Sequence, residues 1–119
     1  MTQATHMVLL WGDEHVWAAR TPQQEAENGA AHARFRVLAG ERGHTLVGSE
    51  ELAAAPLAKV VRRRAAGAPP SVTDGPFGEV TEVVGGFYLV ATADPDDLVG
   101  LVADVLLEDA EIRPVVDHS

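Results

Sequence analysis

The stretch from Gly86 to Ala93 (GFYLVATA) constrains the fold most, because an apolar segment there runs directly into a helix start. Aromatic and β-branched residues dominate it, which favours a strand in the centre of a sheet. Asp94 then offers a helix cap, and Pro95 fits the first helical position. The apolar residues that follow recur every three or four positions, as Leu98, Leu101, Val102, Val105 and Leu106. We therefore expect a central strand followed by a helix with one buried face.

The amino-terminal half predicts a strand and a long helix. His6–Leu10 (HMVLL) is short, apolar and compatible with a strand. The run Thr21–Gln24 (TPQQ) then combines a hydroxyl cap, a proline at the first helical position and a glutamine three residues after the cap. This helix should run to about Arg42, because Gly43 offers a left-handed stop. Its apolar stripe, which His32 borders, consists of Ala31, Phe35, Leu38 and Ala39.

Three further segments have the composition of strands. They are His44–Gly48 (HTLVG), Leu57–Arg64 (LAKVVRRR) and Glu111–Val116 (EIRPVV), and Pro114 indicates that the last lies at an edge. With two of the three strand-like segments between the helices counted, the order is strand, helix, strand, strand, helix, strand. It predicts an α+β fold, the ferredoxin-like βαββαβ arrangement with an antiparallel sheet and both helices on one face. A length of 119 residues suits a single domain over 1–119.

This arrangement leaves one face of the sheet uncovered. An uncovered apolar face is unfavourable for a monomer, so we expect two copies to pack sheet to sheet and to enclose a cavity. The formal charge of −9 argues against a nucleic-acid partner, since phosphate binding depends on Lys and Arg. The chain has no Cys, no signal-like start and no apolar run of about 20 residues, so we expect a cytoplasmic protein without a membrane anchor.

The segment 73–90 (TDGPFGEVTEVVGGFYLV) carries a long motif. It places Asp-Gly-Pro-Phe before two spaced glutamates and a Gly-Gly-Phe run, as Asp74, Gly75, Pro76, Phe77, Glu79, Glu82, Gly85, Gly86 and Phe87. In this register the chain resembles the YCII-related domain family, in its DGPF-type branch. The resemblance extends over 6–117 and implies a ferredoxin-like fold that dimerises into an α/β barrel. Thr81 departs from the pattern, which has Lys at this position, so a role for that ammonium group does not transfer.

The family resemblance also indicates candidate catalytic residues. Its members are mostly uncharacterised, a His and an Asp are usually suspected of acid–base work, and some relatives accompany sigma factors of the extracytoplasmic type. Asp74 matches the Asp of the motif, and His32 matches a helix position held by His in some relatives. The alternatives stay open: His32 can be a helix histidine with an inert partner, and Asp74 can be a turn former.

Four other residues are candidates for ligand binding. Arg62 and Arg64 point to one face of their strand and, if that face lines the cavity, can clamp a carboxylate or phosphate; otherwise they are solvated edge charges. Trp11 and Phe77 are packing residues or pocket walls. Gly85 and Gly86 favour a bulge or a close backbone approach, because no phosphate-binding loop surrounds them. No cofactor is implied, and no metal is expected, because the remaining histidines lack ligand spacing: His6, His15, His44 and His118.

These residues support three functional hypotheses. The first is a cofactor-independent lyase or isomerase that acts on a small carbonyl or anionic compound with His32 and Asp74 as the acid–base pair. The second is a non-catalytic ligand-binding or regulatory accessory protein. In the third, the motif is purely structural. The substrate and any assembly beyond a homodimer do not follow from the sequence.

Overall fold

A computed structural model describes residues 3–78 and 80–119 of the chain. Four strands form an antiparallel sheet in the order β2-β5-β1-β6. A separate two-stranded sheet pairs β3 with β4. The elements are β1 (Ala4–Gly12), α1 (Glu14–Ala18), α2 (Pro22–Glu41), β2 (Thr45–Glu51), η1 (Ala55–Leu57), β3 (Lys59–Arg62), β4 (Ser71–Asp74), β5 (Val83–Thr92), α3 (Pro95–Val105) and β6 (Asp109–Pro114).

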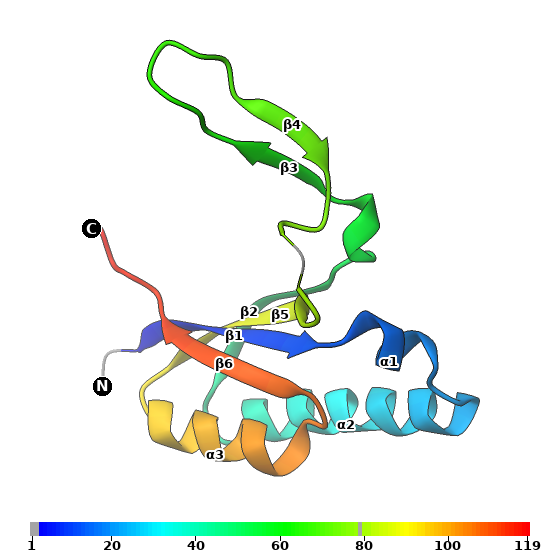
Figure 1. Cartoon of the computed structure of the whole chain (residues 1–119). Helices are drawn as coiled ribbons and strands as arrows, with labels where there is room; N and C mark the ends of the chain where they lie inside the picture. The colour runs from blue at the N-terminus through cyan, green and yellow to red at the C-terminus, as the bar shows by residue number, and fades with distance from the viewer. Residues whose placement is uncertain (1–2, 79) are drawn as a thin grey trace.

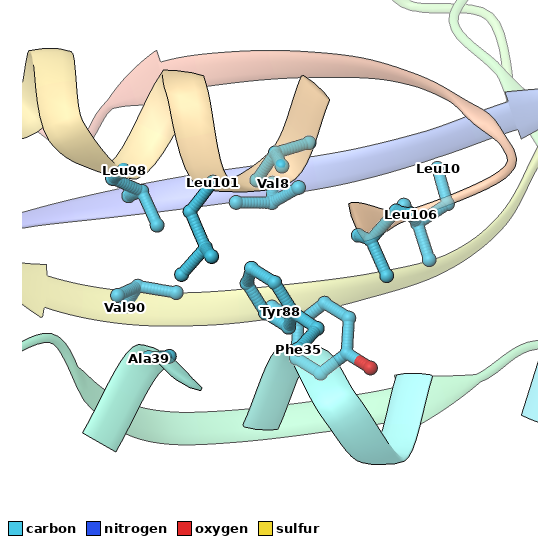
Figure 2. Close-up of a cluster of buried hydrophobic side chains, with 10 residues drawn as sticks. Val8, Leu10, Phe35, Ala39, Tyr88, Val90, Leu98, Leu101 and Leu106 are labelled. Atoms are coloured by element: carbon cyan, nitrogen blue, oxygen red, sulfur yellow. The ribbon is translucent and has the colours of Figure 1, made fainter. Parts of the chain in front are cut away.

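The main sheet and the two long helices confirm the α+β, ferredoxin-like expectation. Helices α2 and α3 lie side by side on one face of the sheet (Figure 1). Between them and the sheet lies the core, in which Phe35, Val8, Val90 and Leu98 are fully buried (Figure 2). Burial of such side chains is the main favourable term for a domain of this size.

Both long helices begin where their caps predicted. The Thr21 hydroxyl accepts from the Gln24 backbone N–H at 3.1 Å, and the Gln24 side chain accepts from the Thr21 N–H at 2.9 Å, which completes a capping box. Asp94 caps α3 by accepting from the backbone N–H of Asp97 at 3.1 Å. Gly43 has a φ of 84°, the left-handed conformation expected after α2.

The strand expected at 57–64 forms, but outside the main sheet. It is the shorter β3, which pairs with β4 so that Val61 lies opposite Val72. The two strands and their connection, Lys59–Asp74, project from the side of the sheet that faces away from the helices (Figure 1); we call this segment the arm. Alternation within a short strand does not distinguish a sheet strand from one half of a separate hairpin, so the sequence could not assign the pairing.

The face of the main sheet that α2 and α3 leave uncovered is apolar at its centre. Leu9 pairs with Phe87 and Met7 with Leu89, and these side chains alternate with the buried ones along β1 and β5. No described helix covers this face (Figure 1). Among the described residues, no helix is both long and apolar enough to cross a bilayer.

Candidate functional site

A cavity of about 620 Å³ lies between α2 and the end of the sheet where β5 begins. Its walls come from α1, α2, β2, β5 and the link that follows α3. The polar side chains among its lining residues include Arg20, Asn28, His32, Arg36, Tyr88 and Glu108. This is the concave, mixed-polarity setting in which small-molecule sites are found.

His32 is the centre of a hydrogen-bonded chain in this cavity. Its Nε2 lies 2.5 Å from Oε1 of Glu108, and its Nδ1 lies 2.6 Å from the hydroxyl oxygen of Tyr88. The side chains of His32 and Glu108 are only 16% and 11% exposed, so water competes little for these bonds. The three groups come from α2, β5 and the link before β6, which hold them together from distant parts of the sequence.

Tyr88 connects this series of hydrogen bonds to the guanidinium group of Arg36. Arg36 Nη1 donates to the Tyr88 hydroxyl at 3.4 Å, and the tyrosine ring packs against Phe35 in the core (Figure 2). Burial raises the pKa of the Tyr88 hydroxyl, and the guanidinium of Arg36 opposes this shift. The hydroxyl is therefore protonated at neutral pH and can serve as a hydrogen donor.

The chain Glu108–His32–Tyr88 has two proton arrangements. With a neutral imidazole, His32 donates from Nε2 to Glu108 and accepts the Tyr88 O–H at Nδ1. With a protonated imidazole, both ring nitrogens donate, and the Tyr88 hydrogen is free to point toward a ligand in the cavity. A proton can thus pass between His32 and a ligand through the tyrosine hydroxyl, with Glu108 stabilising the imidazolium.

The Gly-Gly pair shapes the wall of the cavity. The register of β1 and β5 shifts opposite Gly85, which is a bulge, and a Cβ on Gly85 would lie 2.6 Å from the Trp17 ring. A Cβ on Gly86 would lie 2.9 Å from the backbone oxygen of Glu50. The expected bulge and close backbone approach are both confirmed, and the missing side chain of Gly85 lets the indole of Trp17 pack against the start of β5.

Some polar groups of the cavity remain available to a ligand. Arg36 forms no ion pair with any described carboxylate, and Asn28 Oδ1 is buried without a hydrogen-bond partner among the described residues. Glu51 pairs with Gly86, so its side chain projects from the same face of the sheet as Tyr88. The described residues contain no group of three His, Asp or Glu side chains placed to hold a metal ion.

The other candidate residues from the sequence lie away from His32 in the single chain. Asp74 is 74% exposed at the end of β4 and forms an ion pair with Lys59. The Arg62 guanidinium lies over the Phe77 ring at 4.0 Å, and the exposed Arg64 follows β3 in the arm.

A second, apolar cavity of about 610 Å³ lies at the base of the arm, and both Trp11 and Phe77 line it. Trp11 also donates from Nε1 to Glu111 at 3.1 Å. Glu82 lines the same cavity, whereas Glu79 lies outside the described residues.

Two members of the site were missed from sequence. Tyr88 is the only tyrosine of the chain and lies in the predicted central strand, Gly86–Ala93. A single hydroxyl in an otherwise apolar strand could have indicated a site residue. Glu108 follows α3 in a short link, 76 positions from His32, and nothing local marks it as the partner of a histidine.

A second histidine is held in a separate, structural cluster. His44 is buried, and its ring nitrogens lie 2.7 Å from Thr92 Oγ1 and 2.7 Å from Asp97 Oδ2. Asp97 also forms an ion pair with Arg42, and hydrogen bonds from Arg42 and His44 hold the pKa of this carboxyl below its usual value. This cluster ties the end of α2 to the start of α3.

Comparison with models of known protein families identifies the family of this chain. The family model of the YCII-related domain matches residues 5–116, which is nearly the whole chain. No curated protein matches the chain.

Proposed function

Because the chain belongs to the YCII-related domain family, we propose that it is a cofactor-independent acid–base enzyme, a lyase or isomerase for a small carbonyl or carboxylate compound. Within the family we place it in the DGPF-type branch, on the run Asp74–Phe77 and the Gly-Gly-Phe that follows. We further propose that it works in the cytoplasm as a homodimer packed through the uncovered sheet face.

One observation carries the proposal: His32 is fixed between Glu108 and the Tyr88 hydroxyl at the wall of a cavity. A buried carboxylate that orients an imidazole is the arrangement that general acid–base catalysis needs. In the proposed reaction, His32 starts as an imidazolium. As the α-carbon proton of the substrate passes to a carboxylate of the cavity, for which Glu51 is available, Tyr88 donates its proton to the carbonyl oxygen and His32 donates its Nδ1 proton to the tyrosine oxygen, which gives a neutral enol. Arg36 holds the substrate carboxylate and stabilises negative charge on the tyrosine oxygen.

Asp74 keeps a part in this proposal only through a second copy. Within one chain, Glu108 is the carboxylate that contacts His32, and Asp74 sits on the arm. The arm rises on the side where the second copy would pack, so the partner's arm is the element that can bring Asp74, Arg62 and Arg64 toward a cavity (Figure 1).

The experiment is proton exchange between small carbonyl acids and D₂O, followed by NMR for a panel of oxo and hydroxy acids. Tyr88→Phe and His32→Asn should each slow the exchange by about 10²- to 10⁴-fold, the usual contribution of a positioned acid or base. His15→Asn is the matched control, because His15 is exposed on α1, and it should exchange at the wild-type rate. Absence of exchange across the panel would refute the enzyme proposal.

Asp74→Asn tests the acid–base pair expected from the sequence. The substitution should abolish turnover and leave the dimer intact, because among the described residues the exposed carboxylate makes only the Lys59 contact. An unchanged rate would remove Asp74 from the reaction and leave the Glu108–His32–Tyr88 chain as the whole machinery.

One observation favours the alternative, a ligand-binding or regulatory accessory protein. Both ring nitrogens of His32 are already bonded inside the chain, which leaves neither for a substrate. In that case the same acids would shift the NMR signals of the protein on binding without exchanging their protons, and Arg36→Gln would weaken binding.

A further inference from the structure

The arm differs in charge from the rest of the chain. It contains four of the nine cationic residues, Lys59, Arg62, Arg63 and Arg64, and only one of the 18 acidic ones, Asp74. The arm therefore carries a formal charge of +3, and the rest of the chain carries −12. Such a separation favours contact between the arm of one molecule and the body of another.

The arm also exposes apolar side chains on one face, and contact of such side chains with water is unfavourable for an isolated hairpin. Val61 and Val72 lie opposite each other in the β3–β4 register, so they share one face, and they are 49% and 63% exposed. The connection Ala65–Pro70 (AAGAPP) contains no charged residue. A two-stranded ribbon is marginally stable alone and gains stability when another surface covers one face.

The direction of the arm limits what that surface can be. It projects on the side of the sheet that α2 and α3 leave uncovered (Figure 1). A second copy seated on the apolar face around Leu9 and Phe87 would therefore lie alongside the arm. On that face, Glu50 pairs with Phe87 in the register and forms no ion pair within the described residues, so it offers a carboxylate to an incoming arginine.

We propose that the arm grips the body of a second copy of this chain. Val61 and Val72 pack against the partner, and Arg63 and Arg64 pair with the carboxylates of its acidic body. Arg62 is already engaged with Phe77 and supports the base of the arm. The inference rests on the homodimer proposed above and adds the element that holds it.

The test is sedimentation velocity over a range of concentrations, with variants that change only exposed positions. Arg63→Glu with Arg64→Glu reverses the free charge of the arm, and Val72→Glu places a charge on its apolar face. The control for the first is Arg34→Glu, an exposed arginine of α2. The control for the second is Val37→Glu, because Val37 on α2 is 60% exposed and so matches Val72. Circular dichroism confirms that each variant is folded.

We expect the wild type to dimerise. The Kd of the dimer should rise at least about tenfold in both arm variants, which corresponds to a loss of about 1.4 kcal/mol of binding free energy, and it should stay unchanged in both controls. Added salt should weaken the dimer of the wild type more than that of the Arg63/Arg64 variant. A photoreactive amino acid at position 72 should cross-link to the body of a second chain.

Four results would overturn the inference. A dimer of unchanged affinity in both arm variants would mean that the arm stays in solvent, while the dimer itself stands. A wild-type chain that is monomeric throughout would refute the dimer and the arm contact together. Cross-linking from position 72 to the same chain, or a gel shift with DNA that the arginine reversal abolishes, would assign the arm to another surface.

Discussion

Replacement of Tyr88 by Phe tests whether the proton chain exists as a bonded unit. The substitution removes the hydroxyl that lies 2.6 Å from Nδ1 of His32 and keeps the ring, whose centroid lies 4.8 Å from that of Phe35. The core therefore stays filled, and the change removes only the hydrogen bonds of the hydroxyl, the short one to His32 and the longer one from Arg36. Because the imidazole nitrogen loses its partner while the His32 side chain is only 16% exposed, the free energy of unfolding should fall by about 1–3 kcal/mol.

The assay is urea unfolding followed by circular dichroism, as a double-mutant cycle with His32→Leu. The leucine leaves Glu108 unpaired in both the single and the double variant, so this cost cancels in the cycle. If His32 and Tyr88 share a bond, the double variant should lose less stability than the sum of the singles, by at least about 0.5 kcal/mol. Strict additivity, or an unchanged urea midpoint in Tyr88→Phe, would refute the hydrogen bond between His32 and Tyr88.

Three further substitutions test other parts of the structure. Gly85→Ala should displace the Trp17 ring, alter its fluorescence and lower the free energy of unfolding by about 1–3 kcal/mol through overpacking. The control is Gly40→Ala in α2, where open space surrounds the glycine, and this substitution should raise the free energy of unfolding by about 0.5–1 kcal/mol. Equal effects of the two substitutions would contradict the close packing of Gly85 against Trp17. The Asp97 carboxyl has its pKa lowered chiefly by the hydrogen bond from Arg42, so its stabilising contribution is present above its ordinary pKa of 3.8 and is lost as pH falls through the lower folded value. The stabilities of the wild type and Asp97→Asn should therefore differ above about pH 4 and converge below it, and curves that stay parallel in urea titrations would oppose this account.

The parts of the fold that the sequence predicted are those that local chemistry decides. The capping residues Thr21 and Asp94 mark the helix starts, because side-chain caps act within three residues. The apolar run 86–93 marks the central part of β5 for the same local reason. The five-residue helix α1 was not predicted, because the glycine and acidic residues that follow Trp11 suit both a turn and a helix cap.

The parts that the sequence did not predict depend on distant pairing. The position of His32 on the border of its apolar stripe indicated that it faces the interior, but its partner Glu108 is brought to it by the packing of α3 on the sheet. The pairing of β3 with β4 is of the same kind, since the strand at 71–74 was hidden by the turn residues that follow it at Gly75 and Pro76.

The segment that carries the arm leaves and rejoins the main sheet at neighbouring positions of two adjacent strands, β2 and β5. Glu51, the last residue of β2, pairs with Gly86 of β5, so the two chain ends at this point are one strand spacing apart. The 31 residues between Glu51 and Val83, the first residue of β5, are in effect an insertion at the turn of a β-hairpin, and a much shorter connection could close the same hairpin. The length and composition of this segment can therefore change without altering the register of the sheet. Such changes would alter the surface offered to a partner and leave the fold of the body the same.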